Sequence, residues 1–111
     1  MTSQKFIAFI EKLLTKTKTG EIRWNRLSRT PAWASSNKSF SCNAGDMDIR
    51  LCSDEDCDSI TFYIAYDSDM PTSSIDVETD EERQVAIRLI NYIYDQFPNL
   101  EKAIDRFLDN F

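Results

Sequence analysis

Residues 60–66, with the sequence ITFYIAY, constrain the fold more than any other stretch, because apolar residues alternate there with their neighbours. Ile60, Phe62 and Ile64 lie on one side of an extended chain, and the residues between them lie on the other. The segment is also rich in the β-branched and aromatic residues that favour strands. We therefore predict a β-strand that buries one of its faces.

Shorter stretches with the same alternation surround this strand. They comprise residues 21–25, 39–43 and 47–52, and more briefly residues 75–77. The turn-forming sequence NAGD, at 43–46, separates two of them. Consecutive strands joined by short turns are typical of an antiparallel sheet, so we predict one of three to five strands.

Helical spacing of apolar residues marks both ends of the chain. Residues 3–18 form an amphipathic pattern, with Ser3 as a plausible N-cap and Gly20 just past the last turn. The sequence TDEE at 79–82 is a capping box, and Pro98 separates the helix that follows from a last one. The apolar stripes of these two helices consist of Val85, Ala86, Leu89, Ile90, Ile93 and Phe97, and of Leu100, Ile104, Phe107, Leu108 and Phe111.

These elements predict an α+β fold with an N-terminal helix, the antiparallel sheet, and two C-terminal helices packed on one sheet face. A chain of 111 residues with 41% hydrophobic residues suits a single domain, 1–111. No apolar run approaches the ~20 residues of a membrane span. The N-terminus also lacks the small-residue cleavage site of a signal peptide. We therefore expect a cytoplasmic protein that makes no membrane contact.

The residue types that the chain lacks argue against catalysis. It contains no histidine, which excludes Ser-His-Asp triads, Cys-His dyads and histidine-bound zinc within one chain. It contains only two glycines, so it has no glycine-rich phosphate-binding loop. We predict that the protein is not an enzyme and that it uses no cofactor.

Charge is distributed unevenly along the sequence. Residues 1–40 carry a net charge of +6, residues 41–82 carry -12, and residues 83–111 are neutral. Such blocks bear on partners and association rather than on fold. Our leading interpretation is a small interaction module that docks on a protein partner through an acidic surface. We expect that surface to consist of Asp54, Glu55, Asp56, Asp58, Asp67 and Asp69.

The basic first third supports an alternative, an accessory domain that binds nucleic acid. Arginines interleaved with Trp24 and Trp33 are typical of contacts to a single strand. The acidic block argues against this reading, because it repels phosphate. Attraction between the basic and acidic blocks of two molecules also predicts weak self-association. The candidate nucleic-acid-binding residues are Lys12, Lys16, Arg23, Arg26 and Arg29.

The stretch CSDEDCDS, residues 52–59, could hold a metal ion or close a hairpin. Its three aspartates match the first ligand positions of a calcium-binding EF-hand loop, but Ser59 replaces the required glycine and Ala65 the closing glutamate. Zinc would need more ligands than Cys52 and Cys57 provide. We therefore predict a solvated hairpin loop without metal. The odd count of three cysteines indicates free thiols, with Cys42 a small buried residue.

The segment KTKTGEIRW, residues 16–24, resembles a K-T-x-x-G-x-I-x-W pattern in small uncharacterised bacterial proteins. This resemblance implies a bacterial or mobile-element origin. It brings no functional residue, because those proteins have no agreed activity. Physically, the pattern describes the end of a helix, a glycine that stops it, and a strand whose Ile22 and Trp24 enter the core.

Overall fold

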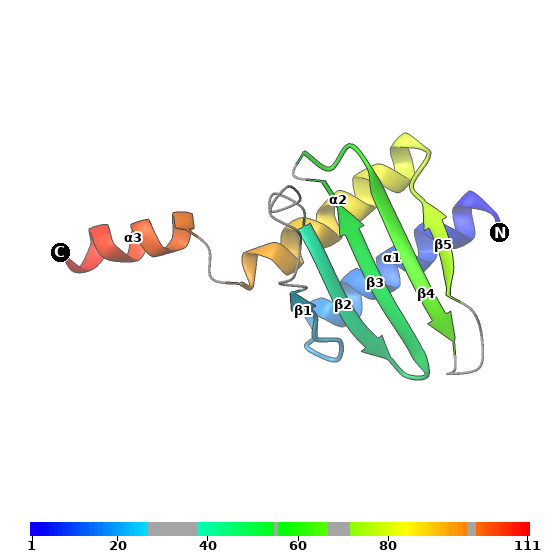
Figure 1. Ribbon diagram of the computed structural model, residues 1–111, viewed down its shortest axis with the longest axis horizontal. Coiled ribbons are helices and arrows are strands. Elements are labelled where there is room, and N and C mark those ends of the chain that lie inside the picture. The colour runs from blue at the N-terminus through cyan, green and yellow to red at the C-terminus, as the bar shows by residue number, and fades with distance from the viewer. Residues whose placement is uncertain (27–37, 55, 67–71, 98–99) are drawn as a thin grey trace.

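The computed structural model describes residues 1–26, 38–54, 56–66, 72–97 and 100–111. It confirms the predicted α+β class, with a helix first, a five-stranded antiparallel sheet next and two helices last (Figure 1). The elements are α1 (Ser3–Lys18), β1 (Asn25–Arg26), β2 (Lys38–Ala44), β3 (Met47–Ser53), β4 (Ile60–Tyr66), β5 (Ser73–Asp76), α2 (Asp80–Asp95) and α3 (Leu100–Asn110).

The strands follow one another across the sheet in the order β1-β2-β3-β4-β5, and every neighbouring pair is antiparallel. The register places Phe40, Leu51 and Phe62 side by side on one face, with Ile75 next to them on β5. The first three are fully buried. The alternation in the sequence therefore reports the side-chain orientation correctly, because successive residues of a strand point to opposite faces.

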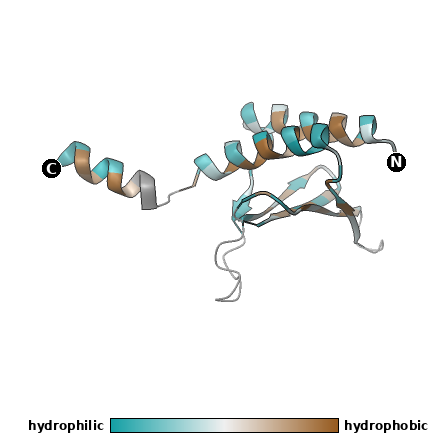
Figure 2. Ribbon diagram, turned by 90° about the horizontal axis from the view of Figure 1, so that it is seen from above, coloured by the Kyte–Doolittle hydropathy of each residue, from teal (hydrophilic) through white to brown (hydrophobic). Residues whose placement is uncertain are grey.

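Helices α1 and α2 cover this apolar face, and both lie on the same side of the sheet (Figure 2). Their buried side chains include Ile10 and Leu89, which are completely enclosed. Phe6 of α1 meets Phe62 of β4 edge to face, with ring centroids 5.5 Å apart. The result is a two-layer structure with one core between helices and sheet.

The two covering helices run parallel to each other. At their first turns, the hydroxyl of Ser3 donates a hydrogen bond to the carboxylate of Glu82. At their last turns, the ammonium group of Lys18 lies over the ring of Tyr92. The positive ends of both helix dipoles therefore lie at one end of the molecule and the negative ends at the other.

Three details of the sequence prediction need correction. The alternation at 21–25 does not form a strand: residues 21–24 belong to the turn after α1, where the Ile22 amide donates to the Lys16 carbonyl, and β1 is only Asn25–Arg26.

The other two details concern helices. The N-cap of α1 is Thr2, whose hydroxyl accepts from the Lys5 amide at 3.2 Å, and Ser3 is instead the first helical residue. The last helix does not pack on the sheet, because α1 and α2 already cover its apolar face. In Figure 1, α3 extends away from the end of α2. Phe107 of α3 and Phe111, which follows the helix, are 59% and 94% exposed and stack on each other.

None of the helices within the described ranges combines the length and the apolar character that a membrane crossing requires.

Candidate functional site

The connection between β3 and β4 is a hairpin loop ordered by hydrogen bonds among its own residues. The carboxylate Oδ1 of Asp54 accepts hydrogen bonds from the amides of Asp58, at 2.7 Å, and Ser59, at 3.3 Å. Cys57 takes a left-handed conformation, with φ of 60°, and its amide donates to the carbonyl of Asp54. The predicted hairpin loop is therefore present, and the carboxylate of Asp54 closes it.

A side chain from α2 fixes the same loop from outside. Arg83 donates from Nη1 to the backbone carbonyls of Cys57 and Asp58, at 3.0 and 2.7 Å. These bonds use a charged donor, which makes them stronger than neutral ones. They also tie the loop to the first turns of α2, so that two acidic segments that are distant in the sequence become neighbours.

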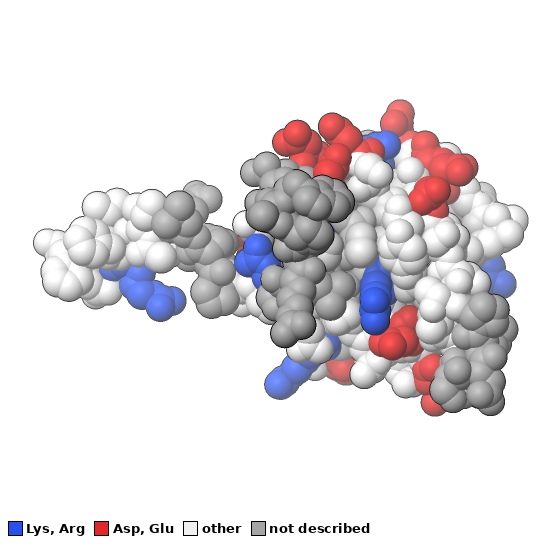
Figure 3. Space-filling view, in the orientation of Figure 1, with Lys and Arg blue, Asp and Glu red and all other residues white. Residues whose placement is uncertain are grey.

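Exposed carboxylates from three segments gather at this end of the molecule. They come from the β3–β4 loop, from the end of β5 with the residues after it, and from the first turn of α2. Figure 3 shows acidic side chains along the upper edge of the sheet, where β3 and β5 end and β4 begins. We call this surface the acidic end; its exposed residues are Asp56, Asp58, Asp76, Glu78, Asp80 and Glu81.

Glu82 lies beside these residues but is buried, with 6% of its surface exposed. Its Oε1 accepts from the amides of Glu78 and Thr79, at 3.0 and 3.3 Å, and its Oε2 accepts from the hydroxyl of Ser3. The hydrogen bond from Ser3, followed by that from the Glu78 amide, lowers the pKa of Glu82 below its ordinary value. Glu82 therefore completes the predicted capping box and joins α1 to α2.

The predicted acidic surface is only partly described. Asp54, Asp56 and Asp58 have the positions given above, whereas Glu55, Asp67 and Asp69 lie outside the described residues. The sequence prediction left out the four other members of the acidic end, Asp76, Glu78, Asp80 and Glu81, although they belong to the same acidic block. Their grouping with the hairpin loop depends on the pairing of β5 with β4, which no local signal reveals.

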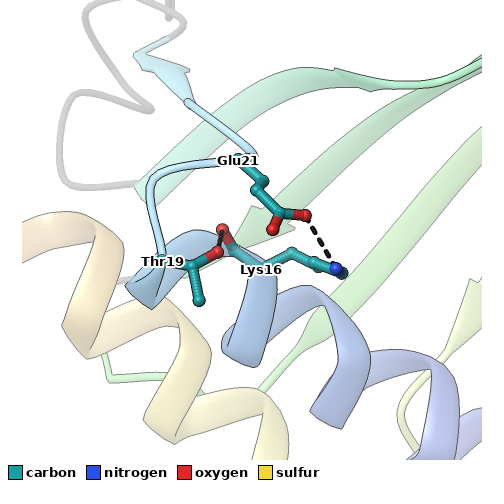
Figure 4. A network of polar contacts seen from close by, with 3 residues as sticks. All are labelled: Lys16, Thr19 and Glu21. Atoms are coloured by element: carbon teal, nitrogen blue, oxygen red, sulfur yellow. Dashed lines mark hydrogen bonds and ion pairs between the residues drawn. The ribbon is translucent and has the colours of Figure 1, made fainter.

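Two of the basic candidates, Lys16 and Arg26, have local partners within the described residues. The ammonium group of Lys16 lies 2.7 Å from the carboxylate of Glu21, and the Lys16 carbonyl accepts from the Thr19 hydroxyl (Figure 4). The guanidinium of Arg26 lies over one ring of α2, that of Tyr94, with Lys38 close to the same ring.

Of the remaining basic candidates, Lys12 and Arg23 are exposed, and Arg29 lies outside the described residues, as does the proposed stacking residue Trp33. Trp24, the other proposed stacking residue, is buried, with 5% of its surface exposed. Its ring is therefore not available to stack on a base.

The K-T-x-x-G-x-I-x-W segment forms the joint between α1 and the sheet. The buried hydroxyl of Thr17 donates to the Leu13 carbonyl at 2.6 Å and accepts from the Trp24 indole nitrogen at 2.9 Å. Gly20 has a φ of 83°, so the chain can reverse just past the helix. Thr17, Gly20 and Trp24 of the segment thus have structural roles.

The opposite face of the sheet carries a shallow hollow of about 290 Å³, lined in part by Asp48, Arg50, Cys52 and Tyr63. Neighbouring Cys42 lies in the core, where burial, with a smaller contribution from Asp48, raises the pKa of its thiol to about 12. All three cysteines are free. No group of three or more possible metal ligands occurs among the residues whose placement is described.

Comparison with known proteins adds no relative: no protein-family model matches the chain, and no curated protein or solved structure shows significant similarity to it.

Proposed function

We propose that this protein is a non-enzymatic interaction module that docks on a basic surface of another protein through its acidic end. The observation that carries the proposal is the convergence of exposed carboxylates from three chain segments on one end of the fold. The hairpin loop and the start of α2 are held together there by the two hydrogen bonds of Arg83. The surface is therefore preorganised, which reduces the entropy lost on binding.

The negative charge at the acidic end exceeds the positive charge of the two helix N-termini that lie there. Two parallel helix N-termini supply roughly +0.5 each, or about one positive charge together. Six exposed carboxylates face solvent at the same end, besides the carboxylates of Asp54 and Glu82. Capping and dipole compensation thus account for only a part of the acidic end, and an excess of several negative charges remains to attract a basic partner.

The non-enzymatic part of the proposal is supported by the composition and by the thiols. The chain has no histidine, and Cys42 has a pKa of about 12, so its thiolate is not formed near neutral pH. The carboxylates of Asp54 and Glu82 accept hydrogen bonds from backbone amides, and that of Glu82 also from the Ser3 hydroxyl, so these groups are engaged by the fold itself.

A pull-down from the source cell tests the proposal. The variant Asp56→Lys/Asp58→Lys reverses charge at the acidic end, and Asp105→Lys/Asp109→Lys makes the same change on exposed positions of α3. We expect basic proteins to be captured by the wild type and the α3 variant and lost by the loop variant. Capture should also weaken at a few hundred millimolar salt, where the Debye length falls below ~8 Å. Equal capture by all three proteins would contradict the proposal.

The nucleic-acid alternative is tested separately by a gel shift with single-stranded DNA and RNA at low salt. Our proposal predicts no shift. A shift that Arg23→Glu/Arg26→Glu abolishes, and that Asp56→Lys/Asp58→Lys leaves in place, would favour the alternative.

A further inference from the structure

The outer edge of β5 borders a groove whose other wall is the start of α1. β5 is the terminal strand of the sheet, and no described residue forms a strand beyond it. The groove has a volume of about 470 Å³ and is lined on the helix side by Ser3 and Phe6 and on the strand side by Ile75, Asp76 and Glu78. Figure 1 shows the start of α1 emerging beside this edge.

The pairing of β5 with β4 determines which of its peptide groups face the groove. The amide of Val77 donates to the carbonyl of Ile60 at 2.9 Å, so the peptide groups of Val77 point at β4. Because this direction alternates along an antiparallel strand, the groups of Ile75 also point at β4, whereas those of Ser74 and Asp76 point outward. Two donors and two acceptors are thus directed toward the free edge, at the spacing of an added strand.

The side chains along this edge also alternate in character. Ile75 is half-buried on the helix side, where it forms an apolar wall of the groove with Phe6. Asp76 lies on the other face of the sheet, where its carboxylate accepts from the Thr61 hydroxyl at 2.8 Å, and Glu78 follows it as an exposed acid. An added strand would therefore place one set of its side chains against Phe6 and Ile75 and the other set near carboxylates.

Charge identifies the kind of occupant. A second copy of β5 would bring the acids of both edges together, and like charges on paired strands are destabilising. An extended segment with lysine or arginine at alternate positions meets Asp76 and Glu78 with opposite charge and leaves small apolar side chains for the groove. We propose that the outer edge of β5 binds an extended basic segment of a protein partner as an additional strand, an inference that rests on the proposed acidic docking function.

The experiment uses a fluorescein-labelled peptide of alternating lysine and valine, with a glutamate–valine peptide of equal length as control. We expect saturable binding of the lysine peptide alone, measured by fluorescence anisotropy at low salt. In the bound state, hydrogen exchange of the Ser74 and Asp76 amides should slow at least tenfold, and that of the Ile75 amide, already paired with β4, should change little. This measurement on the wild-type protein does not depend on any variant folding.

Two variants and a matched control complete the test. Ser74→Pro removes an outward donor at a position where an edge strand tolerates proline. Asp76→Lys reverses the charge on the edge, and Asp46→Lys makes the same change in the exposed β2–β3 turn, away from β5. We expect at least a tenfold loss of affinity in the first two and less than a twofold change in the third.

The outcomes separate this inference from the function on which it rests. Binding that survives Ser74→Pro without amide protection, and that Asp56→Lys/Asp58→Lys abolishes, would overturn strand addition while supporting acidic docking. Equal binding of the glutamate peptide would overturn the charge argument. If the lysine peptide does not bind while the acidic end still captures a partner in the pull-down, the inference alone fails. If neither binds, both fail.

Discussion

Replacing Thr17 by valine tests the joint between α1 and the sheet at the level of a single oxygen atom. Valine has nearly the shape of threonine, so the packing is kept, but the acceptor of the Trp24 indole is lost. Thr17 is 3% exposed and Trp24 is 5% exposed, so water does not replace the missing group. The indole N–H is then buried without a partner.

The expected cost follows from this burial. A buried donor left unsatisfied costs about 1–3 kcal/mol, more than the net worth of an average hydrogen bond. Thr17 also loses its own bond to the Leu13 carbonyl, but that carbonyl belongs to the helix ladder. We therefore expect Thr17→Val to lower the free energy of unfolding by about 1–3 kcal/mol, and Tm by at least roughly 4 °C.

Thr15→Val provides a matched control on the same helix. The Thr15 hydroxyl donates to the Glu11 carbonyl at 3.0 Å, the same local bond, but the residue is exposed and no indole depends on it. Its replacement should change stability by less than about 0.5 kcal/mol. Urea unfolding followed by circular dichroism measures both variants. Equal losses in Thr17→Val and Thr15→Val would refute the reasoning.

A double-mutant cycle with Trp24→Phe isolates the pair. Phenylalanine removes the indole donor, so Thr17→Val should cost less in that background than in the wild type. A coupling free energy near zero would show that the Thr17–Trp24 hydrogen bond does not stabilise the fold.

Further predictions concern the groups that the structure places in defined environments. Glu82→Gln should destabilise the protein at pH 7. Because folding lowers the pKa of Glu82, its carboxylate stabilises the fold fully above the pKa of the unfolded chain, about 4.3, and this stabilisation is lost as pH falls through the lower pKa of the folded state. The free energy of unfolding of the variant should therefore decrease less steeply on acidification than that of the wild type. Asp54→Ala should cost about 1–2 kcal/mol by urea unfolding and Asp56→Ala less than about 0.5, because only Asp54 binds loop amides. Cys42 should resist alkylation at pH 8 in the native protein, by mass spectrometry, and react after denaturation. Removal of residues 98–111 should leave the cooperative unfolding of the remainder intact, by calorimetry, since the described side chains of this segment, 103–111, are exposed and lie outside the core.

Within the fold, the predictions that were confirmed rest on neighbours in the sequence. Alternation at 60–66 depends only on the extended backbone, and the capping box at Thr79 and Glu82 closes within one helical turn. Gly20 ends α1 because it can take a positive φ, which requires no distant partner. The same local reasoning assigned Ser3 as the N-cap, although Thr2 holds that position, since helix ends shift easily by a residue when two hydroxyls are adjacent.

By itself, therefore, the sequence determined the order of helices and sheet, the buried faces of β2, β3 and β4 and the uneven charge, whereas it placed the first strand too early, at 21–25. Only the tertiary structure decided which charges lie together, because β5 pairs with β4 and Arg83 reaches a loop 25 residues away. It also decided that Asp54 serves its own loop and that Trp24 has a buried partner. The amphipathic pattern of α3 predicted a packed helix, but α1 and α2 already cover the apolar face of the sheet, and the described side chains of α3 are exposed.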